Sequence, residues 1–315
     1  MRPHPFYQRL KTYRWLANSG VRLEAWIKRR GAWGRIFCFL LLLAIALSPI
    51  LLPVYWIGAV VGQPNAAEIV ALALIYIGFL IGLPIWGKRI HGWRHTFSYC
   101  GLSLRLQTAR DLLLAMLIGM LGVFALFGLQ TLLGWAEPAA PSSRFGRFVV
   151  EGLVMALAVG FAEEMLFRGW LLSELEENYG SKAALWMCAL FFAAMHFIKP
   201  WPEIVRTLPQ FLGLVVLGMA LVWARRSPTG RPVASVTHSA KLSRAKPRLG
   251  YPIGLHAGLI YGYYLVNVGG LSEYTNEVPE WVTGIDSNPL AGLLGLVLLS
   301  AIAYAFSKTA NPKTH

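Results

Sequence analysis

The stretch from Ile36 to Gly62 reads IFCFLLLLAIALSPILLPVYWIGAVVG and contains no charged residue. A helix needs about 20 consecutive apolar residues to cross a hydrocarbon core about 30 Å thick. This run is therefore long enough to span a bilayer. Its two prolines, Pro49 and Pro53, predict a kink.

Further apolar runs follow along the chain. The 315 residues are 56% hydrophobic and only 14% charged, whereas soluble domains are about a quarter charged. The sequence predicts an all-α, polytopic membrane helix bundle of about eight transmembrane helices. The expected spans are 36–62, 68–87, 112–134, 147–173, 183–198, 207–224, 252–268 and 288–306.

The basic residues predict the orientation of these spans. All Lys and Arg lie on one side of the predicted membrane except Arg144, Arg147, Lys199 and Arg206. The outer loop 269–287 contains acidic residues and no basic one. By the positive-inside rule, both termini face the cytoplasm.

These spans divide the chain into segments. Residues 1–35 form a basic cytoplasmic N-terminal segment, expected to lie on an anionic membrane face. Residues 36–111 form two helices and a cytoplasmic loop. The core is 112–306, with a basic cytoplasmic loop insertion at 226–250, and 307–315 form a cytoplasmic tail.

Other signals are set aside. The net charge of +14 follows the membrane topology, so no nucleic-acid partner is expected, and Lys28-Arg29-Arg30 is a topology determinant. His91 and His95 are four residues apart, but no carboxylate is near them, which argues against zinc. The three cysteines show neither disulfide nor metal-ligand spacing.

Ionisable residues inside spans cost about 2.5–3.5 kcal/mol each and usually mark function. The fourth span carries Glu163-Glu164-Met-Leu-Phe-Arg168. Glu164 and Arg168 are four residues apart, so they share a helix face and are predicted to pair. Glu163 lies about 100° around the helix and stays free for chemistry or for a partner on another helix. The alternative is a structural ion pair between helices.

Two histidines lie inside later spans. Phe192 and His196 are four residues apart in the fifth span, and His256 lies near the start of the seventh, among small residues that allow close helix approach. Each alone could be a structural histidine. Together with the acidic pair they could activate water, with a carboxylate as general base, or they could bind zinc with room for water.

The motifs resemble those of the CAAX-protease and bacteriocin-processing (CPBP, or Abi) family of intramembrane proteases. That family is marked by E-E-x-x-x-R, then F-x-x-x-H, then a later histidine often followed by Asn four residues on. Here the motifs are Glu163 to Arg168, Phe192 to His196, and His256 to Ile260. Order and spacing agree over roughly 112–306, which would be the catalytic core, and the wording around His256 is similar to the bacterial or plastid-type branch.

The resemblance implies roles for these residues. Glu163 would activate water, His196 would orient it, and His256 would stabilise the oxyanion, while Glu164 and Arg168 hold the site electrostatically. The family has been described both as glutamate-type enzymes without a metal and as metalloproteases; in the second case Glu163, His196 and His256 would bind Zn.

Ile260 stands where many members have Asn, and Asn267 lies too far along the helix axis to replace it. Helix rise predicts that Glu163 lies ~18 Å from the cytoplasmic end of its helix and that His256 lies ~10 Å from the cytoplasmic surface. The two side chains can then meet only if a helix is tilted or its start is partly unwound.

The resemblance implies an intramembrane endopeptidase acting on a membrane-associated substrate, either prenylated or not, in a cell inner membrane or a thylakoid-type membrane. Two alternatives stay open. One is a non-catalytic CPBP-like scaffold or self-immunity protein, and the other is a proton-coupled transporter, which also places Glu and His at mid-depth.

Overall fold

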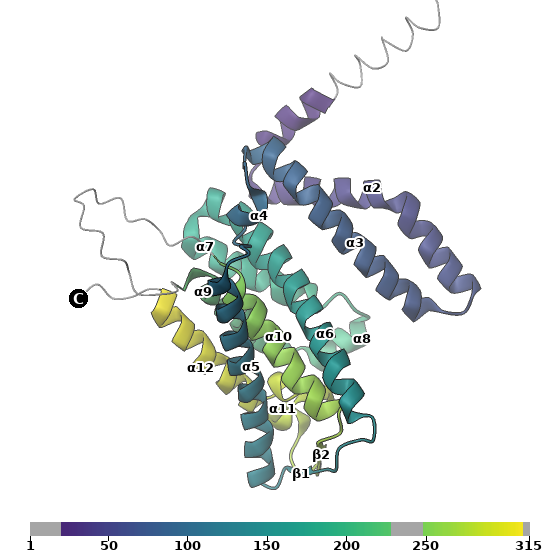
Figure 1. The fold of residues 1–315 in the computed structure, drawn as a ribbon, viewed down its shortest axis with the longest axis vertical. Coiled ribbons are helices and arrows are strands. Elements are labelled where there is room, and N and C mark those ends of the chain that lie inside the picture. The colour runs from purple at the N-terminus through teal and green to yellow at the C-terminus, as the bar shows by residue number, and fades with distance from the viewer. Residues whose placement is uncertain (1–19, 228–247, 311–315) are drawn as a thin grey trace, which may run out of the picture. The chain divides into compact units, whose positions relative to one another are not determined.

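The computed structural model describes residues 20–227 and 248–310. Three predicted segments lie partly outside the described residues: the N-terminal segment before residue 20, the insertion from 228 to 247, and the tail after 310. The described chain is almost wholly helical, which confirms the predicted all-α class (Figure 1). It forms two compact units, one ending at Thr96 and one beginning at Phe97.

The first unit is built on a helical hairpin. Residues 20–28 are helical, and α2 (Ala32–Val60), α3 (Pro64–Trp86) and the π-helix η1 (Gly87–His91) follow. The turn between α2 and α3 uses Gly62 at a φ of 68°, and Pro64 opens α3 at a position where a missing N–H costs nothing. Pro49 and Pro53 lie inside α2, whose ribbon changes direction partway along (Figure 1).

The second unit contains the remaining elements, after the short α4 (Thr96–Tyr99) at its boundary. They are α5 (Leu106–Leu132), β1 (Ala136–Pro138), α6 (Phe145–Glu164), η2 (Met165–Leu171), α7 (Leu172–Met195), α8 (Trp201–Thr207), α9 (Gln210–Arg226), α10 (Gly250–Asn267), β2 (Ser272–Tyr274), α11 (Glu280–Thr283), η3 (Ile285–Ser287), η4 (Pro289–Ala291) and α12 (Leu293–Ala310). The strands β1 and β2 pair antiparallel, with Ala136 opposite Tyr274.

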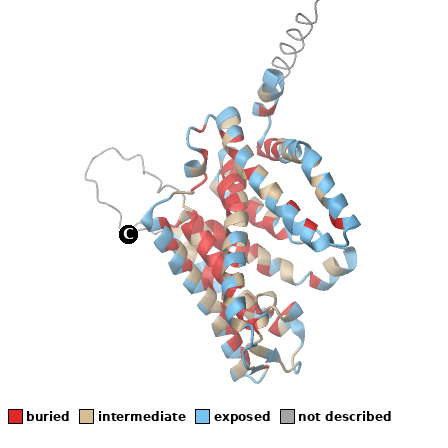
Figure 2. Cartoon of the chain, turned by 45° about the vertical axis from the view of Figure 1, so that its right-hand side comes forward, coloured by how far each residue is buried: buried red, intermediate tan, exposed pale blue. Residues whose placement is uncertain are grey.

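Helix α10 is the centre of this unit. It packs against α5, α6 and α9, and its residues are mostly buried, as the red ribbon in Figure 2 shows for the middle of the bundle. A Cβ placed on Gly254 or Gly258 would lie 2.0 or 2.1 Å from a backbone oxygen of α5. These glycines therefore let the two helix backbones touch, as small residues do in membrane bundles.

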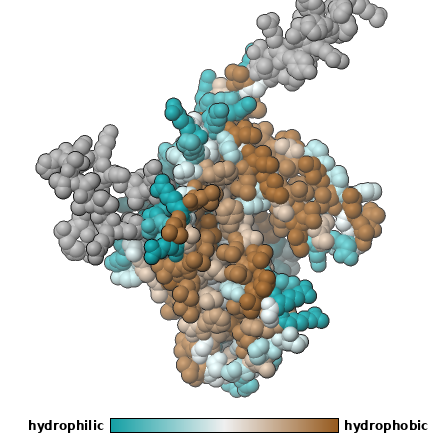
Figure 3. Space-filling view, in the orientation of Figure 1, coloured by the Kyte–Doolittle hydropathy of each residue, from teal (hydrophilic) through white to brown (hydrophobic). Residues whose placement is uncertain are grey.

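Five described helical stretches are long and apolar enough to cross a membrane: Ala32–Val60, Pro64–His91, Leu106–Leu132, Phe145–Met195 and Leu293–Ala310. A sixth results if α8 and α9, bent by 74°, form one broken span. Their outward faces are hydrophobic (brown in Figure 3), with side chains such as Leu72 and Val154 more than 60% exposed. A surface of this kind fits lipid rather than water.

This number is lower than the predicted eight, for two reasons. The chain from Phe145 to Met195 is one helical stretch, although Gly180 (φ 70°, ψ 173°) breaks it where the sequence predicted two spans. Helix α10 is too rich in glycine and tyrosine to pass as a lipid-facing span. Helix α10 does not need an apolar surface all round, because protein surrounds it on several sides.

Candidate active site

The acidic pair lies at the C-terminal end of α6, and its two members have different environments. Glu164 is fully buried and forms an ion pair of 2.8 Å with the fully buried guanidinium of Arg168. The side chain of Glu163 is 29% exposed. The predicted Glu164–Arg168 pair is therefore present, and Glu163 is directed elsewhere.

A π-helix follows immediately after the two glutamates. Residues Met165–Leu171 have π-helical hydrogen bonding, so Arg168 lies in a widened turn. Single π-turns inside α-helices occur frequently at functional sites, because they turn side chains away from the regular 3.6-residue register. Sequence reasoning missed this element, since no single residue type marks it.

The histidine of α10 joins the pair from a helix distant in sequence. Nδ1 of His256 lies 2.8 Å from Oε1 of Glu164, the oxygen that Arg168 also contacts. Its other ring nitrogen, Nε2, lies 4.0 Å from Oε2 of Glu163. Glu163 and His256, for which helix rise predicts different distances from the helix ends, are thus brought within 4.0 Å of each other.

Gly160 explains how the two helices meet. A Cβ at this position would lie 3.1 Å from both Ile253 O and Ala257 N of α10, so α6 and α10 come close one turn before the glutamates. This close approach is what allows one imidazole to reach both carboxylates.

His196 approaches the same carboxylate from the end of α7. It is the residue at which that helix ends, and its Nδ1 lies 2.8 Å from the carbonyl oxygen of Phe192, one of the carbonyls that a helix end leaves without an intrahelical partner. Its Nε2 lies 3.8 Å from Oε2 of Glu163.

The buried ring of Phe192 supports the cluster. The guanidinium carbon of Arg168 lies 4.2 Å from the centre of this ring, within cation–π range. The imidazole of His196 lies on the ring as well, with centroids 4.6 Å apart. Phe192 thus contacts both sides of the site through its ring and holds His196 through its carbonyl.

These contacts decide which atoms the histidines present. A carbonyl or carboxylate oxygen can only accept, so each Nδ1 carries the hydrogen. In the neutral imidazoles Nε2 is then an acceptor, and both Nε2 atoms are directed toward Oε2 of Glu163. That oxygen is buried and accepts no hydrogen bond from the residues that the structure describes.

Glu163, His196 and His256 are the residues that would bind zinc if the site were a metal centre. An imidazole–imidazole–carboxylate set suits zinc chemically. Within residues 20–227 and 248–310, however, no group of three or more His, Cys, Asp or Glu side chains is arranged to hold a metal ion. No step of the reaction is therefore assigned to a metal.

Ile260, which takes the position of the family's Asn, packs into an apolar cluster with Ala156, Ala257, Tyr261 and Leu265. Asn267 donates a hydrogen bond of 2.7 Å to the hydroxyl of Tyr263.

A second polar layer braces the π-helix. The hydroxyl of Ser173 donates to the carbonyl of Gly169 at 2.6 Å and accepts from Arg225 at 2.8 Å. Arg225 also contacts Glu176 at 3.3 Å. Sequence reasoning counted Arg225 only as a topology charge, and the i, i+4 spacing of Gly169 and Ser173 was the one local signal available.

The fold and this cluster define a polytopic helical membrane protein with an acid–histidine site between its helices. Residues 145–241 match the family model described as Rce1-like, type II CAAX prenyl endopeptidase Rce1-like. The matched part includes Glu163, Glu164, Arg168, Phe192 and His196, whereas His256 lies beyond it. The match confirms the resemblance to the CPBP membrane proteases, a family of peptidases. Comparison with curated proteins and with solved structures gives no match.

Proposed function

We propose that the protein is an intramembrane endopeptidase of the CAAX-protease type, in which Glu163 activates a water molecule. One observation carries the proposal. The Nε2 atoms of His196 and His256 lie 3.8 and 4.0 Å from the same oxygen of Glu163. These separations are longer than direct hydrogen bonds and suit a bridging water.

The burial of the side chains supports this division of roles. The side chains of Glu163 and His196 are about a third exposed, so a substrate can reach these residues, although Oε2 of Glu163 itself is shielded. Glu164 and Arg168 are fully buried and neutralise each other. The side chains of Glu163 and His196 are therefore partly exposed, while those of Glu164 and Arg168 are fully buried.

The reaction follows from these positions. Glu163 removes a proton from water as the water oxygen attacks the peptide carbonyl carbon, and His196 orients that water. His256 enters this step with both ring nitrogens protonated, so that its Nε2–H donates to the negative oxygen while Nδ1 stays bonded to the Glu164 carboxylate. The C–N bond then breaks, and Glu163 returns the proton to the leaving amine.

The substrate is a membrane-associated peptide that reaches the site from the cytoplasmic side. The distribution of Lys and Arg supports this orientation, since nearly all of them lie on the side of the predicted inner loops. A hydrophobic or prenylated tail would enter between the helices, whose outward faces are apolar.

The test compares the wild type with Glu163→Gln in proteoliposomes, measuring cleavage of a hydrophobic-peptide library, prenylated and not, together with thermal stability. Cleavage reduced about 10²–10⁴-fold at an unchanged melting temperature supports the proposal. Glu151→Gln, on the same helix and in an exposed pair, is the matched control. An inactive wild type, with an early-melting Glu163→Gln, would favour a scaffold instead.

A chelator separates the two chemistries that the family resemblance left open. Because the described side chains are not arranged as metal ligands, cleavage should survive treatment with 1,10-phenanthroline. If the chelator abolished cleavage and added Zn²⁺ restored it, the metalloprotease mechanism would be established.

A further inference from the structure

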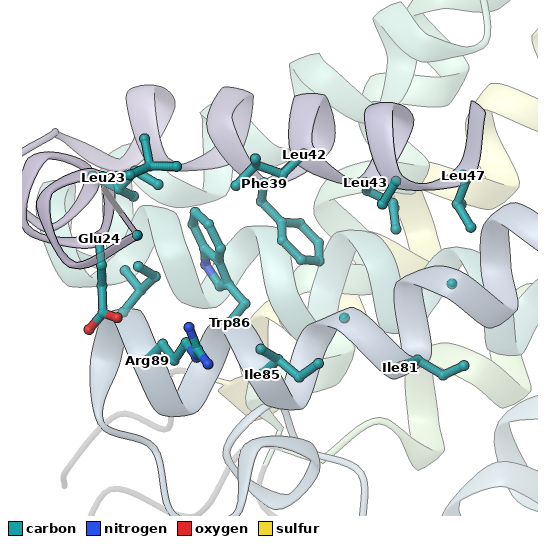
Figure 4. Close-up of a pocket in the computed structure, with 16 residues that line it drawn as sticks. Leu23, Glu24, Phe39, Leu42, Leu43, Leu47, Ile81, Ile85, Trp86 and Arg89 are labelled. Carbon is teal, nitrogen blue, oxygen red and sulfur yellow. The ribbon is translucent and has the colours of Figure 1, made fainter. Parts of the chain in front are cut away.

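The first unit holds a cavity of about 520 Å³, which belongs to the usual size range of ligand sites. It is lined by the helical residues 20–27, by one face of α2 and by one face of α3 (Figure 4). The candidate active site lies in the other unit, and the matched family region does not include this one. The cavity is thus a feature that proteolysis does not explain.

Two glycines of α3 form part of the cavity wall and let α2 side chains pack closely on it. Gly78 and Gly82 both line it, and a Cβ on Gly78 would lie 2.8 Å from the side chain of Leu47 on α2. Phe39 and Leu43 of α2 complete the wall. The interior therefore presents hydrocarbon along its length and suits an apolar chain.

The charges lie at one end only. Figure 4 shows Glu24 and Arg89 together at one end of the cavity, with Leu47 and Ile81 toward the other. Lys28 pairs with Glu24 at 2.7 Å. Arg89 is exposed and acts on the Glu24 carboxylate through its charge. With Lys88 beside it, this end has more positive than negative charge.

The dimensions agree with one leaflet of a bilayer. From Gly78 to Arg89 the helix rises about 16 Å, and half of a hydrocarbon core about 30 Å thick is about 15 Å. The polar end then falls at the headgroup level and the apolar end near the midplane. Basic residues at this level attract anionic lipids.

We propose that this cavity binds one anionic phospholipid, with an acyl chain between α2 and α3 and its phosphate at Arg89. The proposal is independent of the peptidase activity. An acyl chain in the cavity contacts both helices of the hairpin, so the lipid stabilises it.

Native mass spectrometry of the full chain, released from nanodiscs of phosphatidylglycerol and phosphatidylcholine, tests the proposal. The wild type should retain one phosphatidylglycerol. Leu43→Trp, which fills the cavity, should lose it, whereas Leu41→Trp, on the same helix but outside the lining, should retain it. Arg89→Gln should reduce the preference for phosphatidylglycerol over phosphatidylcholine about fivefold, and the exposed neighbour Lys88→Gln should change it less.

Two outcomes would overturn the proposal. One is equal loss of lipid in Leu41→Trp and Leu43→Trp, which would show nonspecific annular lipid. The other is retention without regard to headgroup charge, or retention of an isoprenoid in place of phospholipid. Leu41→Trp also serves as the folding control, because both variants add the same side chain to α2.

Discussion

Nδ1 of His256 lies 2.8 Å from Oε1 of Glu164, although the two residues are 92 positions apart. The bond joins α10 to α6, and it fixes which nitrogen of the imidazole carries the hydrogen. The same carboxylate oxygen is held by Arg168. One buried group thus ties together the local ion pair and the distant helix.

His256 has two separable functions, one for each ring nitrogen. Asn places an amide N–H near the position of Nδ1 and has nothing at Nε2, so His256→Asn should keep the bond to Glu164 and the stability. Loss of the donor at the oxyanion should reduce cleavage about 10²–10³-fold. His256→Leu leaves Glu164 with one donor fewer and should also lower the free energy of unfolding by about 1–3 kcal/mol. Peptide cleavage and denaturant unfolding of both variants check this, and equal stability losses would contradict it.

The buried ion pair should be costly to break from one side. Arg168→Met leaves the Glu164 carboxylate without its cation and should lower the free energy of unfolding by about 3–5 kcal/mol. Glu164→Gln combined with Arg168→Met should recover most of that loss, since no buried charge remains. Unfolding in detergent measures both.

The pair of Arg147 and Glu151 is the matched control for this experiment. It has the same i, i+4 spacing on the same helix and a contact of 2.7 Å, but it is exposed. Arg147→Met should lower the free energy of unfolding far less than Arg168→Met, because exposed ion pairs contribute little. A comparable loss from the two arginine substitutions would show that burial does not matter here.

The contact between α5 and α10 should not tolerate a methyl group. Gly254→Ala would place its Cβ 2.0 Å from the carbonyl oxygen of Leu112 and force the helices apart. We expect a loss of about 1–3 kcal/mol in the free energy of unfolding, with reduced cleavage because His256 follows two residues later. Gly128→Ala, on α5, meets nothing within 4 Å and should not destabilise. Thermal melting that ranks the two variants in the opposite order would refute the close contact.

The ion pair between Arg206 and Asp286 should give a small, acid-sensitive contribution to stability. Asp286 accepts from Arg206 at 2.7 and 3.0 Å, and this hydrogen bonding lowers the pKa of Asp286 below its ordinary value of 3.8. A carboxyl whose pKa is lowered on folding stabilises above the unfolded pKa, and the contribution is lost as the pH falls through the folded value.

Because the pair is exposed, Asp286→Asn should cost no more than about 1 kcal/mol at neutral pH. Melting of wild type and variant from pH 7 downward should show a gap that is constant to about pH 4 and closes in more acidic solution. A gap that persists unchanged into strong acid would assign the loss to packing instead. Glu277→Gln, outside this ion pair, is the control.

The sequence by itself determined the helical class and the local part of the site. Long uncharged apolar runs cannot satisfy their backbone in lipid except as helices, so 36–62 had few alternatives. The Glu164–Arg168 pair followed from i, i+4 spacing, which is a property of one helix. Phe192 and His196 followed from the same spacing, and the structure places their side chains in contact.

Only the tertiary structure decided how the polar groups are distributed among helices. The sequence paired Glu164 with Arg168, and helix rise required a tilt or a partly unwound helix start before His256 could reach Glu163. Close approach at Gly160 and Gly254 brings His256 to both carboxylates, because helix separation depends on the side chains of both partners. The π-helix at Met165–Leu171 and the central position of α10 were also undetermined, since both depend on what surrounds a segment rather than on the segment itself.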